Sequence, residues 1–132
     1  MNLNAHNLVK SGKLLSPQTL SSSPTLGPAL DRRNYHGSAK AVINVGAVTG
    51  TSPTLTLEIH HSDASGGTYT LWKTLATDLA EVAVENLVLE YELDLQGAKG
   101  FLKLNVAQGG TSPVHTLGAV LEMLPRTAPA NS

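Results

Sequence analysis

The feature that most constrains the fold is a strict alternation of apolar and polar side chains. In residues 54–61, Leu55, Leu57 and Ile59 alternate with threonine, glutamate and histidine. Successive side chains of a β-strand point to opposite faces of its sheet, so this pattern predicts a strand with one buried face. A slip of one residue in register would expose all three apolar side chains to water.

The same period of two recurs along the chain. It predicts further strands in residues 39–48, 87–95 and 102–106. The glycine- and serine-rich run SDASGG predicts a tight connection to a returning strand, TYTLWKTL. Residues 75–87 fit either a helix or a strand, and we favour extended structure. Residues 114–124 are apolar on both faces, which indicates a strand that is central or covered by a neighbouring subunit.

These six or seven strands, with turn signals between them, predict an all-β chain: an antiparallel two-sheet β-sandwich or jelly roll. A chain of 132 residues is long enough for one core. We place this domain at residues 31–126 and expect 127–132 to form a flexible C-terminal tail.

Residues 1–30 show no sustained period of 2 or 3.6 and are rich in serine, proline and leucine. We therefore expect an extended N-terminal arm. Such a segment buries too little apolar surface by itself to offset its ordering entropy. Its leucines should lie on a partner, and the candidate contact residues are Leu14, Leu15, Leu20 and Leu26.

The charge balance indicates no particular class of partner. Nine basic and ten acidic residues leave a formal net charge of -1, so no general field attracts nucleic acid or an anionic membrane. We expect neither partner, and we expect no signal peptide or membrane helix because no apolar run is long enough. The absence of cysteine excludes disulfides and sulfur-ligated zinc.

The residues suggest no catalytic or cofactor chemistry. His60, His61 and Asp63 are of metal-binding types, but adjacent strand residues point apart, so we favour a hairpin end over a metal site. No nucleophile-elbow motif is present, and the glycine runs lack the spacing of phosphate-binding loops. We therefore expect no enzyme activity, metal or cofactor.

Several charged and aromatic residues are candidates for surface contacts. Glu90, Glu92 and Asp94 share one strand face, which favours a solvated surface, with a cation site or a basic partner as alternatives. Arg32 and Arg33 lie at the junction of arm and domain, where they could hold a carboxylate of a neighbour. Phe101 is out of register with the apolar face of its strand and is also a candidate contact.

Three runs of sequence resemble one known family. They are GSAKAVINVGAVTGTSPTLTLEIHHSD, GGTYTLWKTLA and YELDLQGAKGFLKLNVAQGGTSPVHTLGAVLEMLPR. In content and order they resemble the small jelly-roll cement, or decoration, proteins of tailed-bacteriophage heads, over about residues 31–126. The chain departs from the family at Lys99 and Phe101, because Gly100 separates a basic–aromatic pair.

The resemblance implies a structural virion protein on the outer surface of a phage capsid. It would bind the major capsid protein, bridge neighbouring capsid subunits, and self-associate as a homodimer or homotrimer at a symmetry axis. The alternatives are another virion structural protein, in the neck or tail, and a carbohydrate-binding jelly-roll module.

Overall fold

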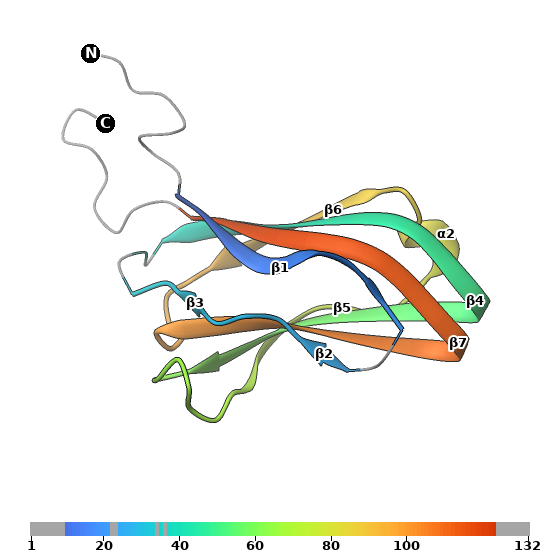
Figure 1. Cartoon of the computed structure of the whole chain (residues 1–132). Helices are drawn as coiled ribbons and strands as arrows, with labels where there is room; N and C mark the ends of the chain where they lie inside the picture. The colour runs from blue at the N-terminus through green and yellow to red at the C-terminus, as the bar shows by residue number, and fades with distance from the viewer. Residues whose placement is uncertain (1–9, 22–23, 34, 36, 124–132) are drawn as a thin grey trace, which may run out of the picture.

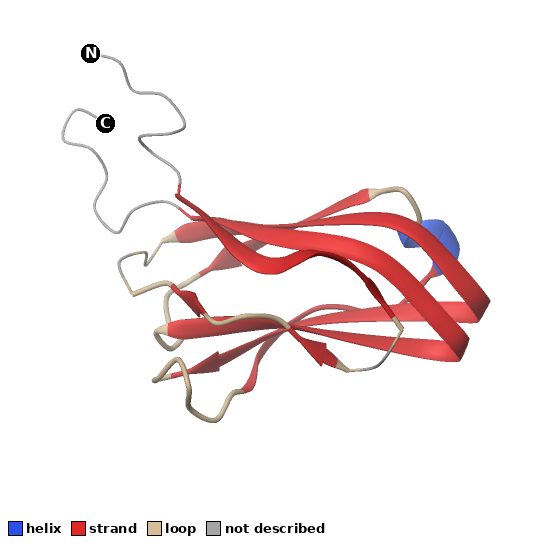
Figure 2. Cartoon of the chain, in the orientation of Figure 1, coloured by secondary structure: helices blue, strands red, loops and turns tan. Residues whose placement is uncertain are grey.

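The computed structural model describes residues 10–21, 24–33, 35 and 37–123, and Figure 1 shows them as two layers of strands. The elements are β1 (Lys10–Leu20), β2 (Thr25–Leu26), β3 (Leu30–Asp31), β4 (Ser38–Ser62), β5 (Thr70–Ala80), α2 (Glu81–Val84), β6 (Val88–Asp94) and β7 (Phe101–Met123). Figure 2 shows that strands make up nearly all of the described structure.

Two long bent strands, β4 and β7, hold the fold together. They pair antiparallel over almost their whole lengths, and each passes from one layer to the other. The bend lies where the register shifts, between Val45 and Thr54. Gly110 is needed there, because its φ is +95° and a Cβ would lie 2.5 Å from the carbonyl oxygen of Ser52.

The two halves of these strands are the centres of two sheets. Sheet one has the order β1, second half of β7, first half of β4, β6. Sheet two has β2 and β3 on one edge, then the first half of β7, the second half of β4, and β5. All pairs are antiparallel and the connections cross between layers, so the fold is a jelly roll and the predicted fold class is confirmed.

The core lies between the sheets and follows the alternation in the sequence. Leu55, Leu57 and Ile59 are completely buried, as their register predicts. The pattern of residues 39–47 also holds as far as Val45. A β-bulge then shifts the strand, so that Val48 is buried and Ala47 is exposed.

The predicted N-terminal arm is not what the structure shows for residues 10–20. Lys10–Leu20 is strand β1 and pairs with β7 at the edge of sheet one. Two irregularities in this pairing, between Lys13 and Gln18, interrupt the period of two and explain why the sequence showed no strand pattern. Pro17 is compatible with an edge strand, which needs fewer backbone donors. Residues 1–9 lie outside the described part of the chain.

The structure assigns two segments that the sequence left open, residues 75–87 and 114–123. Residues 75–80 are extended as predicted, but Glu81–Val84 forms one helical turn that buries Val84. The segment from Val114 is central in sheet one, between β1 and β4. Leu124 and the predicted tail at 127–132 lie outside the described residues. No helix in the described ranges has the length and apolarity to cross a membrane.

Candidate interaction surfaces

The outer surface of sheet one contains an open apolar groove of about 680 Å³. We call this surface face one; it consists of the outward side chains of β1, β7, β4 and β6. The groove follows the second half of β7, with β1 on one side and β4 on the other. Its lining includes Lys13, Pro17, Val42, Gly46, Gly118 and Val120.

Two glycines shape the groove, Gly46 by leaving space and Gly118 by admitting Pro17. Gly46 and Gly118 lie on neighbouring strands and present no side chain to the outside. At Gly118 a Cβ would lie 3.0 Å from both Cα and Cγ of Pro17, so the close approach of β1 requires glycine. The sequence holds only a weak signal for this groove, because glycine stands where alternation predicts an outward side chain. The groove was not identified from the sequence.

Face one also carries partly exposed valines on its three neighbouring strands β7, β4 and β6. Val120 is 38% exposed and Val88, on the far edge strand β6, is 55% exposed. Val42 lies between them, because its register partners are Val120 on one side and Glu90 on the other. Face one therefore combines a hollow with apolar side chains that the chain itself leaves partly uncovered.

Charges flank the apolar part of face one on opposite edges. Glu90, Glu92 and Asp94 project outward from β6, as the sequence predicts, and all three are exposed. Lys40 forms a 3.2 Å ion pair with Glu90. On the other edge, Lys13 of β1 is exposed beside Val120.

The outer surface of sheet two, face two, is built differently. Its centre is Glu58, whose Oε1 is 3.2 Å from Nε2 of His60 and accepts a 3.2 Å hydrogen bond from Nδ2 of Asn105. Lys103, the register partner of His60, places its ammonium 4.5 Å from the ring centre of Tyr69. The polar side chains at this centre thus bond to one another.

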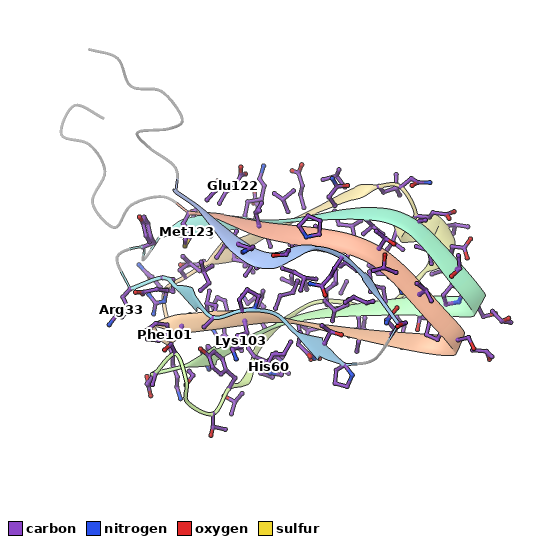
Figure 3. All side chains as sticks on the ribbon, in the orientation of Figure 1. Arg33, His60, Phe101, Lys103, Glu122 and Met123 are labelled. Carbon is purple, nitrogen blue, oxygen red and sulfur yellow. The ribbon has the colours of Figure 1, made fainter. Side chains whose placement is uncertain are left out.

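One end of face two carries the predicted contact residues Arg33 and Phe101. Figure 3 shows both on the same layer as Lys103 and His60, whereas Glu122 lies on the other layer. Arg33 donates to both carboxylate oxygens of Asp31, at 3.0 and 2.7 Å, and its guanidinium lies 4.9 Å from the centre of the Phe101 ring. These hydrogen bonds hold the pKa of Asp31 below its ordinary value.

The other predicted contact residues have different environments. Leu14, Leu15 and Leu20 are at most 4% exposed in the chain's own core, so the prediction that they need a foreign surface is wrong. Arg32 is also buried, and its Nε donates a 2.9 Å hydrogen bond to the carbonyl oxygen of Lys99. Leu26 on the edge strand β2 is 45% exposed.

The two adjacent histidines point apart. His60 lies on face two with Glu58, while Nδ1 of His61 accepts a 3.1 Å hydrogen bond from the backbone N–H of Lys99. The ring of His61 stacks on Trp72 with centroids 6.1 Å apart, and burial lowers its pKa. Among the described residues, no three histidine, aspartate or glutamate side chains are placed to hold a metal ion.

A third histidine, His115, is completely buried at the bend of β7. Its Nδ1 lies 2.6 Å from Oε1 of Gln108, and its Nε2 has no hydrogen-bond partner among the described residues. Because Gln108 offers an acceptor oxygen, Nδ1 carries the proton and Nε2 is left as an unsatisfied acceptor. Burial lowers the pKa of His115.

Comparison with known proteins supports the fold. The chain is similar to the VP2 subviral particle of infectious bursal disease virus, with a TM-score of 0.59, 12% identity and 89% of this chain covered. The structure of the Gx strain of that virus gives a TM-score of 0.54, 10% identity and 90% coverage. The chain spans 32% of each of these longer chains.

A weaker similarity relates the chain to the CBM22-1 xylan-binding domain of Paenibacillus barcinonensis Xyn10C. The TM-score is 0.48 at 10% identity, and the alignment covers 90% of this chain and 95% of that domain. No protein-family model matches the sequence, and no curated protein sequence matches it significantly. At the identities found, the similarity to VP2 establishes a shared jelly-roll fold.

Proposed function

We propose that this chain is a structural protein of a virus particle that binds the outer surface of a tailed-phage head and cements neighbouring major capsid subunits. The observation that carries the proposal is the open apolar groove of face one. An uncovered apolar hollow with a charged rim is typical of a protein contact surface. The proposal gives the chain a binding role and no catalytic one.

Two further observations support this role. The sequence runs that resemble phage cement proteins fall on β4, β5, β6 and β7, which build the centres of both sheets. The jelly-roll fold is shared with VP2 of a virus particle. Many copies on one shell would also add their contacts, so that each single contact can be weak.

A pelleting experiment tests the proposal. The full chain is mixed with bare, expanded heads of a phage that encodes it, and the bound fraction is measured. We expect saturable co-sedimentation at a fixed ratio to the major capsid protein. Val120→Lys places a charge in the groove and should abolish binding, whereas Leu71→Lys, at a 52% exposed position on sheet two, should bind normally.

Other outcomes redirect the proposal. If heads do not bind the chain but isolated necks or tails do, the chain has a different place in the virion. If nothing in the virion binds it, the cement role is wrong.

A carbohydrate-binding role is the second candidate. Tyr69, Trp72 and Phe101 lie on sheet two and its adjoining loops, and Glu58 and Asn105 offer polar groups nearby. Against this role, a cation already lies over each of these rings, from Lys103, Lys73 and Arg33. A glycan array decides the matter: a specific hit that is lost in Tyr69→Ala would favour sugar binding.

A further inference from the structure

We propose that His115 is a pH-sensitive switch at the bend of β7: when its imidazole gains a second proton, the C-terminal end of β1 separates from sheet one. The groove of face one then loses the wall that β1 provides. This inference rests on the proposed function only for the use of the groove, because the movement of β1 is a property of the free chain.

The bend itself does not require a polar side chain at position 115. The run GTSP occurs in both bent strands, at residues 50–53 of β4 and 110–113 of β7. Its glycine and serine have positive φ in both strands, +115° and +50° in β4 and +95° and +48° in β7. Two positions after the proline, β4 buries Leu55, whereas β7 buries His115. Since leucine serves at the equivalent position of β4, the shape of the bend does not explain the histidine.

Apolar neighbours enclose the imidazole of His115. Its register partners are Leu20 of β1 and Val48 of β4, and both are buried in the core. Nδ1 lies 2.6 Å from Oε1 of Gln108, whereas Nε2 is buried without a partner among the described residues. A charged ring in these surroundings would be costly, so the closed chain favours the neutral ring.

The described carboxylates do not compensate a charge on His115. Glu85 comes closest by its contacts, because its Oε2 accepts a 3.4 Å hydrogen bond from the backbone N–H of Val48. Burial is nevertheless the only cause of the lowered pKa of His115. The other described titratable side chains of the three strands point to the outer faces or lie near strand ends: Lys13 on β1; Lys40, Glu58, His60 and His61 on β4; Lys103 and Glu122 on β7.

A second proton changes the hydrogen bonding of the ring. Both ring nitrogens become donors, and Oε1 of Gln108 accepts from Nδ1 alone. The N–H of Nε2 would remain buried without an acceptor, which costs free energy until water reaches it. Protonation of His115 therefore favours an opened form of the site over the closed one.

The strand that opens at lowest cost is β1. It is an edge strand of sheet one, blue in Figure 1, whereas β4 is paired with β6 on one side and β7 on the other. Besides its backbone pairing, the end of β1 is held by the packing of Leu20 and by an exposed 3.0 Å hydrogen bond between the hydroxyls of Thr19 and Thr116. Edge segments with exposed bonds open locally at low cost.

Separation of β1 removes part of the groove. Lys13, Leu15 and Pro17 of β1 line one side of it, and Thr116, the residue after His115, also lines it. Opening that begins at the C-terminal end of β1 withdraws Pro17 from Gly118, which it contacts in the closed chain. Acid therefore weakens the docking surface of face one.

The pH range follows from the ordinary pKa of histidine. In the opened form His115 meets water and titrates near its ordinary value of 6.5, whereas burial lowers the pKa in the closed form. The opened population is therefore constant well above pH 6.5 and rises as the pH falls below it. Between about pH 7.5 and about pH 5.5 the increase is at most about tenfold for one proton.

Hydrogen exchange of the free full chain, followed by mass spectrometry of its peptides, tests the inference. The exchange rate of residues 16–20 of β1 is divided by that of β6, the other edge strand of sheet one, which cancels the intrinsic effect of pH. We expect this ratio to rise about tenfold when the pH is lowered from about 7.5 to about 5.5. An unchanged ratio would overturn the inference.

Three variants assign the effect to His115. His115→Leu carries the side chain that β4 has at the equivalent position, and its ratio should be the same at both pH values. His115→Gln is also neutral at both and should behave likewise, so the test survives if the leucine variant does not fold by circular dichroism. His61→Gln removes another histidine of lowered pKa and should keep the wild-type increase. A pH-dependent ratio in the His115 variants, or its loss in His61→Gln, would contradict the assignment.

The two proposals fail separately. A ratio that rises in a chain that does not bind heads leaves the switch standing and refutes the cement role. A constant ratio in a chain that binds heads does the reverse.

Discussion

The two outer faces of the sandwich are built from the same two strands, yet they differ in how their side chains are satisfied. On face two, Glu58 holds His60 and Asn105, and Lys103 covers Tyr69. On face one, Val42 and Val120 line an apolar groove that stays open beside Gly46. A closed polar network stabilises the chain that contains it, whereas an open apolar groove has most to gain from a partner.

The largest expected effect concerns the edge strands of the two sheets. Leu14 of β1 is completely buried, whereas Leu26 of β2 is 45% exposed. Leu14→Ala should lower the free energy of unfolding by about 2–5 kcal/mol, because a cavity forms in the core. Leu26→Ala should change it by less than about 0.5 kcal/mol. Urea titration measures both, and equal small effects would mean that β1 is an arm and not part of the fold.

A smaller effect separates the outward polar residues of the two faces. Glu58→Ala removes the acceptor shared by His60 and Asn105 and should cost about 1–2 kcal/mol of unfolding free energy. Asn44→Ala, at an exposed position on face one, should stay within about 0.5 kcal/mol. If thermal denaturation shows equal losses of stability for the two variants, the hydrogen bonds of Glu58 do not stabilise face two as described above.

The free energy of unfolding should decrease gradually as the pH is lowered. Burial lowers the pKa of His115 in the folded chain, so the unfolded chain binds more protons below the ordinary value of 6.5. The contribution of His115 to the free energy of unfolding is therefore fully present and constant well above pH 6.5. It decreases as the pH falls below 6.5, by no more than about 1.4 kcal/mol per pH unit for one proton.

The control for this prediction is His115→Leu, which removes the titrating group from the bend. Urea titrations between pH 8 and 5 should show a shallower fall in stability for this variant than for the wild type. His61, whose pKa is also lowered, contributes with the same sign in both proteins. Parallel curves for the two proteins would contradict the assignment.

The sequence predicted the fold where alternation is uninterrupted. Leu55, Leu57 and Ile59 are buried in the register that their spacing indicates. It failed for Lys10–Leu20, because bulges break the period of two while the strand continues. Alternation reports local geometry, so it shows neither a strand with irregular pairing nor the continuity of β4 across its bend.

The groove could not be predicted in the same way. It depends on Gly46 lying beside Thr116 of the neighbouring strand and on Pro17 lying against Gly118, 101 positions later in the chain. These are facts of long-range register. The acidic row on β6, by contrast, was predicted, because a single strand determines which side chains share its face.

Lysine acylation followed by mass spectrometry tests the central claim, that face one and not face two binds a partner. Lys13 lies on face one and Lys73 on sheet two, and both are exposed. The rates at both are compared for the free full chain and for the full chain bound to phage heads. The account predicts that acylation of Lys13 slows in the bound sample while that of Lys73 is unchanged. Slower acylation of Lys73 with an unchanged rate at Lys13 would contradict it.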